Sequence, residues 1–585
     1  MIASMLKARI TIILQLALTC LLWLSCICNT QATVLISGIN SQTRNNILAY
    51  LQLDNEACDA PDWRVRRLFA DSETEIQEAL QVVGYYNIEV EKQLEYGEGC
   101  WQANFTINLG EAVVLRTVSI EVDTGGEQDK KLLNVLHECA LRTGDILHHA
   151  KYDSCRRNIA QMAKSRGYFD AKFIERRIDV YPTELAADIT LFFETGRRYV
   201  FGETRFDQTV LDHELVQRVV TYTHGQAYDA VLTRRIQRDL IASAYFDQVE
   251  LINEPRGDPY FDVPILIKLT PGKKYQYSAG IGFATDVGPK LRLGVLNRRA
   301  NSSGHQIEFE INLSKVISET NLSYRIPLKK HKNWFTIDTF FKAEDNDSFE
   351  SNLFSIGGQH IHKRDDEWIR TLFLNLTLED YKTSELDDGQ SKLLIPGISY
   401  SYIAEDYPPR PLQGHRSRAQ LSGAIEGLVT DTSFLQVYGN TKWVFGLWPG
   451  GRLLTRAEMG ATLIEEIDDL PASVRFFAGG DISVRGYAYN SLGPTDMFGS
   501  VVGGENLLVG SLEIDHQISA NWSLAAFVDS GNAYDRLAEF DPATGIGAGI
   551  RWYSLLGPIR LDVAVPLDDS APDDYRVHIT LGPDL

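Results

Sequence analysis

The sequence lacks the short motifs that mark common catalytic sites. It contains no GxSxG nucleophile elbow, no GxxxxGK[ST] phosphate-binding loop and no HExxH zinc motif. It has no CxxC pair and no cluster of cysteine and histidine, so a zinc site is not expected. Acidic residues outnumber basic ones, and the formal net charge is -21. This excess of negative charge argues against a nucleic acid or an anionic membrane surface as partner. We therefore expect no enzyme, no cofactor and no nucleic-acid partner.

Long apolar runs are confined to the first residues. No run of eighteen apolar residues occurs after residue 32, so a helical membrane span is not expected there. Within the first 32 residues, Lys7 and Arg9 precede an apolar run from Ile10 to Cys28, and small residues near Ala32 offer a cleavage point. This pattern predicts an export signal over residues 1–32. An uncleaved membrane anchor is the alternative, because the run is somewhat long for a signal.

Cysteine is absent after Cys155. Three of the seven cysteines lie in the leader, which leaves Cys58, Cys100, Cys139 and Cys155 in the exported part. An exported chain meets an oxidising compartment, so two disulfides are expected. Four cysteines allow three pairings, and we favour Cys58–Cys100 and Cys139–Cys155 because each bond then closes within one of the repeats described next.

A short pattern occurs three times in the first half of the chain. "GYYNIEV" begins at residue 84, "GYFDAKF" at 167 and "AYFDQVE" at 244. Each copy follows apolar residues at helical spacing, such as Ile159, Met162 and Ala163, and precedes segments with period-two alternation. A strand, two helices and two strands form a small α+β unit, and recurrence at this spacing indicates tandem domains. The predicted units are residues 33–111, 112–195 and 196–272.

From about Lys274 the helical spacing fades and strict alternation continues to the end. In "HQIEFEINL", for example, Ile307, Phe309, Ile311 and Leu313 share one face. An oily face opposite a charged face is what a transmembrane barrel strand requires, and only a closed sheet can cross a bilayer. With ~10 residues per strand plus a connection, residues 273–585 supply about sixteen strands. A large soluble β-sandwich is the alternative, but it accounts less well for the length, the export signal and the aromatic strand ends.

One loop in this region carries a recognisable motif. "FFAGGDISVRGYAYNSLGP" sets Arg485 among glycines, and "SVRGY" resembles the [V/I]RG[F/Y] signature of the BamA/TamA superfamily of outer-membrane assembly proteins. "GGENLLVGSLEI", "AAFVDSGNAY" and "GIGAGIRWYSLLGPIRLDVAVPL" resemble the last barrel strands of that superfamily. The resemblance covers almost the whole exported chain. It implies POTRA repeats (β-α-α-β-β) followed by a sixteen-stranded antiparallel barrel.

The resemblance also implies a function. Three repeats are typical of the TamA branch, which serves as the outer-membrane subunit of the translocation and assembly module. It implies an outer-membrane location with the repeats in the periplasm, and assembly of autotransporter-type clients without catalysis. The implied partners are a large TamB-like protein anchored in the inner membrane, unfolded outer-membrane proteins and outer-membrane lipid. A passive porin or a two-partner secretion pore is the alternative function.

In the superfamily the long loop, here residues 476–497, folds into the barrel, and its arginine contacts acidic residues on the inner wall. Alternation in "LLVGSLEID" turns Glu513 inward, and alternation in "WSLAAFVDSGN" does the same for Asp529. Because a buried guanidinium needs carboxylate partners, we expect Arg485 to pair with Asp529, with Glu513 nearby. Gly486 is expected to permit a tight bend and Tyr487 to add a rigid contact. A purely structural role for this latch is the alternative.

The resemblance further implies a barrel that opens between its first and last strands. That seam is expected between "YQYSAGIGFATD" and "YRVHITLGP", where glycines are compatible with weak closure. The candidate seam residues are Gly280, Gly282, Tyr575, Val577, Ile579 and Gly582. The sequence does not identify the clients, the residues that dock the partner, or whether lipids are transported.

Overall fold

The computed structural model describes residues 33–97, 100–364, 366–383, 388–405, 410–427, 429–554, 557–568 and 574–581. The predicted export signal, residues 1–32, lies outside them. Among the described residues, no helix combines the length and the apolar character needed to cross a membrane. Two compact units are distinguished: one holds the residues up to Glu203, the other those from Leu266 onward, and the residues between are divided among them.

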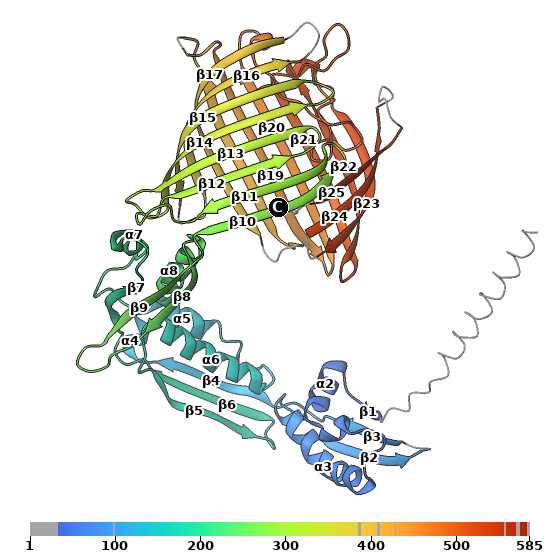
Figure 1. Ribbon diagram of the computed structural model, residues 1–585. Coiled ribbons are helices and arrows are strands. Elements are labelled where there is room, and N and C mark those ends of the chain that lie inside the picture. Colours follow the sequence, from blue (N-terminus) through green and yellow to red (C-terminus); the bar gives the residue numbers. More distant parts are fainter. Residues whose placement is uncertain are drawn as a thin grey trace, which may run out of the picture. The chain divides into compact units, whose positions relative to one another are not determined.

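Three small mixed sheets precede the barrel (Figure 1). Their strand orders are β1-β3-β2, β4-β6-β5 and β7-β9-β8, so the last strand of each repeat lies in the middle of its sheet. In the first two sheets this central strand pairs parallel with the first strand and antiparallel with the other. The elements are β1 (Thr33–Ser37), α2 (Ser41–Tyr50), η1 (Gln52–Asn55), α3 (Asp62–Gln81), β2 (Glu89–Tyr96), β3 (Trp101–Asn108), β4 (Val114–Val122), α4 (Thr124–Glu127), α5 (Lys130–His137), α6 (His149–Ser165), β5 (Lys172–Tyr181), β6 (Ala186–Glu194), β7 (Val200–Asp207), α7 (His213–Gln217), α8 (Ala230–Ala242), β8 (Phe246–Asn253) and β9 (Asp262–Pro271).

The first two repeats are built around apolar cores. In the first, Ile47 of α2 and Leu80 of α3 are fully buried together with Phe105 of β3. The start of α2 is capped by Asn40, whose side chain accepts a hydrogen bond from the Thr43 amide (2.9 Å). Burial of these apolar side chains is the main stabilising contribution to such small domains.

The rest of the chain forms one closed antiparallel barrel of sixteen strands (Figure 1). Pairing around the ring satisfies backbone groups that hydrocarbon could not, and the closing pair, β10 with β25, is described below. The strands are β10 (Tyr275–Ala284), β11 (Gly288–Asn297), β12 (Gln306–Leu313), β13 (Ile317–Pro327), β14 (Asn333–Asp345), β15 (Glu350–Lys363), β16 (Ile369–Lys382), β17 (Asp388–Glu405), β18 (Gly414–Ala424), β19 (Phe434–Trp448), β20 (Gly451–Leu463), β21 (Asn506–Ser519), β22 (Trp522–Tyr534), β23 (Ala543–Ser554), β24 (Gly557–Pro566) and β25 (Arg576–Leu581).

The two faces of the barrel wall differ as the alternation predicts. On β21 the outward side chains Leu512 and Ile514 are about half exposed, whereas the inward Glu513 and Asp515 are buried. Trp522 and Trp552 stack beside each other at paired ends of β22 and β23, where interfacial aromatics are typical of transmembrane barrels. The predicted α+β repeats followed by a sixteen-stranded barrel are therefore confirmed, and the β-sandwich alternative is wrong.

Candidate functional site: the inserted loop and the strand seam

A long loop between β20 and β21, residues 464–505, packs against the inner wall of the barrel. Its side chains Phe476, Val484 and Tyr487 are buried in a small apolar cluster with Leu507 of β21 and Ala533 of β22. Within the loop, Gly479, Gly480 and Gly486 have φ near +100°, a region that side chains with a Cβ rarely adopt. The glycines that exclude a regular element thus let the loop turn tightly inside the barrel.

Arg485 is buried and contacts carboxylates from three strands. Its Nε donates to Asp529 Oδ2 of β22 at 2.6 Å, and a second guanidinium nitrogen donates to Asp529 Oδ1 at 3.0 Å. The remaining nitrogen donates to Glu513 Oε2 of β21 at 2.8 Å and to Asp562 Oδ2 of β24 at 3.2 Å. The Arg485 amide also donates to Asp529, at 3.1 Å. The structure thus brings together the residues predicted for the latch, and adds Asp562.

A second buried arginine completes this network. Arg551 of β23 donates to Glu513 Oε1 at 2.8 Å and lies 2.5 Å from Asp562 Oδ1. The Arg485 guanidinium also lies over the ring of Phe527. Each carboxylate is therefore bonded to at least one arginine, the condition under which buried charges are tolerated. Sequence reasoning missed Arg551, Phe527 and Asp562, although alternation along β24 already turns Asp562 inward.

The residues after Arg485 continue the contact with the last strands. The Gly486 amide donates to His578 Nε2 of β25 at 2.9 Å. The Tyr487 hydroxyl donates to the carboxylate of Asp568 and lies 3.3 Å from the Thr544 carbonyl oxygen. The loop backbone comes so close to β23 that a Cβ on Gly545 would lie 1.9 Å from the Arg485 carbonyl oxygen. A glycine at position 545 is therefore required by this contact.

The first and last strands of the barrel pair over a short length in the described residues, which end at Leu581. There, β10 and β25 share one register pair, Ala284 with Thr580, whereas β10 and β11 share ten pairs from Tyr275–Asn297 to Ala284–Gly288. Hydrogen bonds of Thr285, which follows β10, extend the contact: its amide donates to the Ile579 carbonyl oxygen at 3.1 Å, its Oγ1 lies 3.5 Å from the same oxygen, and the Ile579 amide donates to Thr285 Oγ1 at 2.6 Å.

The predicted seam residues are thus only partly brought together. Ile579 contacts the end of β10, but Gly280 and Gly282 pair with β11 and have no partner on β25 in the described residues. Val577 and Tyr575 are exposed at and just before the start of β25. Gly582 lies outside the described residues. Thr285 was missed, because a turn threonine carries no sequence signal for this role.

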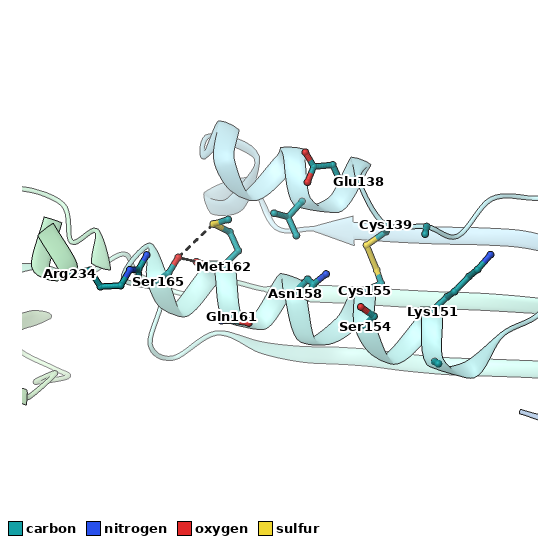
Figure 2. A pocket seen from close by; sticks show the side chains of 13 residues that line it. Glu138, Cys139, Lys151, Ser154, Cys155, Asn158, Gln161, Met162, Ser165 and Arg234 are labelled. Carbon is teal, nitrogen blue, oxygen red and sulfur yellow. Dashed lines mark hydrogen bonds between the residues drawn. A yellow bond between two sulfur atoms is a disulfide. The ribbon is translucent and has the colours of Figure 1, made fainter. Parts of the chain in front are cut away.

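The repeats before the barrel hold the four predicted disulfide cysteines. The structure joins Cys58 to Cys100 and Cys139 to Cys155. The second bond lies beside a groove of about 870 Å³ between α5 and α6, lined mainly by small and polar side chains such as Ser154, Asn158 and Ser165 (Figure 2). Its charged lining residues, Glu138, Lys151 and Arg234, come from separate parts of the chain, and we assign the groove no function.

Comparison with known families matches both parts of the chain. Residues 300–584 match the Omp85 superfamily domain, and residues 33–109 match the POTRA domain described as TamA domain 1.

Among curated proteins, the outer membrane protein assembly factor BamA of Nitratidesulfovibrio vulgaris is 23% identical over 61% of this chain and 47% of its own length. BamA of Neisseria meningitidis is 22% identical over 88% of this chain and 72% of its own length. The chain thus spans about half the length of the first of these relatives.

Among solved structures, BamA from Haemophilus ducreyi lacking POTRA domains 1–3 superposes with a TM-score of 0.62. The identity is 19%, over 80% of this chain and 99% of that one, so this likeness supports the fold alone.

Proposed function

Because the chain is a BamA/TamA-type member of the Omp85 superfamily, located in the outer membrane with its POTRA repeats in the periplasm, we propose that it assembles proteins into that membrane. This assembly of proteins into the membrane requires no catalytic step. The barrel opens between β10 and β25, exposes a strand edge and offers it as a template to a client strand. Main-chain hydrogen bonds along such an edge accept many sequences, which suits a machine with several clients.

The observation that carries this proposal is the contrast between neighbouring strand pairs. Among the residues that the structure describes, β10 and β25 share one register pair, whereas β10 and β11 share ten. A strand edge with unpaired N–H and C=O groups readily adds another strand, and most barrels close fully to prevent this. In the described residues, Ala284 is the position of β10 that pairs with β25, and we propose that a client strand pairs with β10 before it.

A finer assignment, to the TamA branch, is part of the proposal. It is supported by the match of the first repeat to the TamA POTRA domain and by the three small sheets before the barrel. On this assignment the clients are autotransporter-type proteins and the partner is a TamB-like protein anchored in the inner membrane. β2 and β5 lie at edges of the first two sheets, where strand addition from a partner or client is possible.

The alternative function is a passive porin or secretion pore. Such a pore needs an open lumen, but the loop side chains Phe476, Val484 and Tyr487 pack on the inner wall and Arg485 is bonded there. We therefore expect low steady conductance in planar bilayers. Large steady conductance, together with normal levels of outer-membrane proteins after deletion of the gene, would favour the pore.

A disulfide lock across the seam tests the proposal. We would replace Ala284 and Thr580, the one register pair of the seam, with cysteine (A284C and T580C) and oxidise the purified protein in lipid. Because templating requires the seam to open, the locked protein should lose client assembly and regain it on reduction. The measurement is insertion of a radiolabelled autotransporter barrel into proteoliposomes.

The matched control places the same lock where no opening is proposed. Ser278 of β10 pairs with Gly294 of β11, so S278C and G294C form a bond inside a firmly paired part of the wall. This variant should assemble clients whether oxidised or reduced. Full activity of the oxidised seam lock would contradict the proposal, as would equal inhibition by both locks.

A further inference from the structure

We infer that Asp481, four residues before the latch arginine, clasps the barrel seam by binding the first and the last strand at once. The inference rests on the proposed function, since it names the contact that must break before the seam opens. It concerns three side chains that lie far apart in the sequence: Asp286 in the turn after β10, Asp481 in the inserted loop and His578 on β25. They lie close together, with one ligand-type atom of each within 4.8 Å of the others.

The first arm of the clasp joins the loop to the turn after β10. The Asp481 amide donates to Asp286 Oδ2, and in return the Asp286 amide lies 3.4 Å from Asp481 Oδ2. This reciprocal contact depends on the residue before it. A Cβ on Gly480, which has φ +103°, would lie 2.5 Å from Asp286 Oδ2, so only glycine lets the turn approach the loop this closely.

The second arm joins the loop to the last strand. His578 is almost fully buried, and its Nδ1 lies 2.5 Å from Asp481 Oδ1. Its other nitrogen, Nε2, accepts a hydrogen bond from the Gly486 amide. Because Nε2 acts as an acceptor, the proton of the neutral ring is on Nδ1, which therefore donates to Asp481. Both ring nitrogens are thus bonded to the loop, which fixes β25 to it.

The clasp matters because the strands hold each other so weakly. In the described residues, the Ala284–Thr580 pair is supplemented by the hydrogen bonds between Thr285, just after β10, and Ile579 of β25. Asp481 adds a link on each side, and its side chain is only 3% exposed, so water does not weaken the bond to His578. Hydrogen bonds to a buried ionised group contribute more than neutral ones. Release of the loop and opening of the seam are therefore coupled.

This arrangement is distinct from the Arg485 latch. Arg485 bonds to β21, β22 and β24, so it anchors the loop to the continuous wall and touches neither side of the seam. Asp481 bonds to the turn that follows β10 and to β25 itself. It therefore links the two strands, β10 and β25, that must separate when the seam opens. Arg485 thus holds the loop in the barrel, whereas Asp481 is a positioning residue that uses the loop to hold the seam.

The test measures the seam directly, without a client. Spin labels on I281C of β10 and V577C of β25, both on the outer face, report the distance between the strands in the full-length protein in nanodiscs. Asp481→Ala removes the bond to His578 and the acceptor of the Asp286 amide, while the Asp481 backbone amide still donates to Asp286. The population with long distances should rise about tenfold or more, the change expected for loss of a hydrogen bond to a charged group. Asp286→Ala removes only the acceptor of the Asp481 amide and should give a smaller rise.

The matched control is Asp496→Ala in the same loop. Among the described residues, the Asp496 carboxylate accepts hydrogen bonds from the amides of Phe498 and Ser500 in its own loop, so the distances should stay as in the wild type. Heat-modifiable gel migration shows that each variant is a folded barrel; if Asp481→Ala does not fold, Asp286→Ala carries the test. Unchanged distances in a folded Asp481→Ala or Asp286→Ala protein would overturn the clasp. Failure of client assembly in the wild type would refute the proposed function and leave this result unaffected.

Discussion

The repeats and the barrel bury opposite kinds of side chain. The first repeat buries Ile47, Leu80 and Phe105, whereas the barrel fully buries Arg452 and Arg551 along with the carboxylate of Asp529. The difference follows from the solvent. A periplasmic domain turns apolar groups inward, away from water, but a barrel turns them outward to lipid and fills its interior with polar groups. Stability in the barrel therefore depends on pairing of charges, and in the repeats on apolar packing.

The largest expected effect comes from breaking the charged interior. Arg485→Ala leaves Asp529 without its bidentate partner in a buried site, which typically costs ~3–5 kcal/mol. The barrel should lose its heat-modifiable form at a clearly lower temperature or urea concentration. Arg536→Ala is the control, because that side chain is 83% exposed and should have no effect. Equal stability of both variants would show that the charged interior does not hold the barrel together.

The corresponding change in a repeat should act on the repeat alone. Leu80→Ala removes a fully buried side chain from the first repeat, at a cost of ~2–5 kcal/mol. Limited proteolysis should cut the first repeat faster, while heat-modifiable migration of the barrel stays normal. Leu35→Ala, at a side chain that is 49% exposed in the same repeat, is the control and should change little. If the Leu80→Ala variant also lost heat-modifiable migration, the stability of the barrel would depend on the core of the first repeat, contrary to the prediction.

The smallest effect concerns the two disulfides, which only the repeats contain among the described residues. In the chain-entropy account a bond that closes a longer loop stabilises more. The separations are 42 residues for Cys58–Cys100 and 16 for Cys139–Cys155, which predicts a difference of about 0.9 kcal/mol in favour of the first. This difference is measured with two variants, each with both cysteines of one disulfide replaced by serine. The rate of proteolysis of the affected repeat is compared in the full chain. A larger loss of stability on removing Cys139–Cys155 than on removing Cys58–Cys100 would mean that loop length does not decide which disulfide stabilises its repeat more.

Residue patterns accounted for much of the candidate site. Alternation turns Glu513 and Asp529 inward, and the resemblance of "SVRGY" to a family signature pointed to Arg485 as their partner. The same alternation applies to Asp562, but periodicity states which face a residue lies on and not which side chains meet across the lumen. Arg551 and Phe527 were missed for that reason. Alternation along β25 likewise turns His578 inward, but it gives no indication of what this side chain binds.

The sequence alone determines the class of each region, because the spacing of apolar residues is a local property: period two for strands that face lipid, and spacings of three and four for helices that cover a small sheet. Only the tertiary structure decides which distant groups meet. The contact between Asp481 and Asp286 joins residues 195 positions apart, and the single β10–β25 pair depends on how the whole sheet tilts and closes. Both are set by the geometry of barrel closure, to which all sixteen strands contribute and which no short segment encodes.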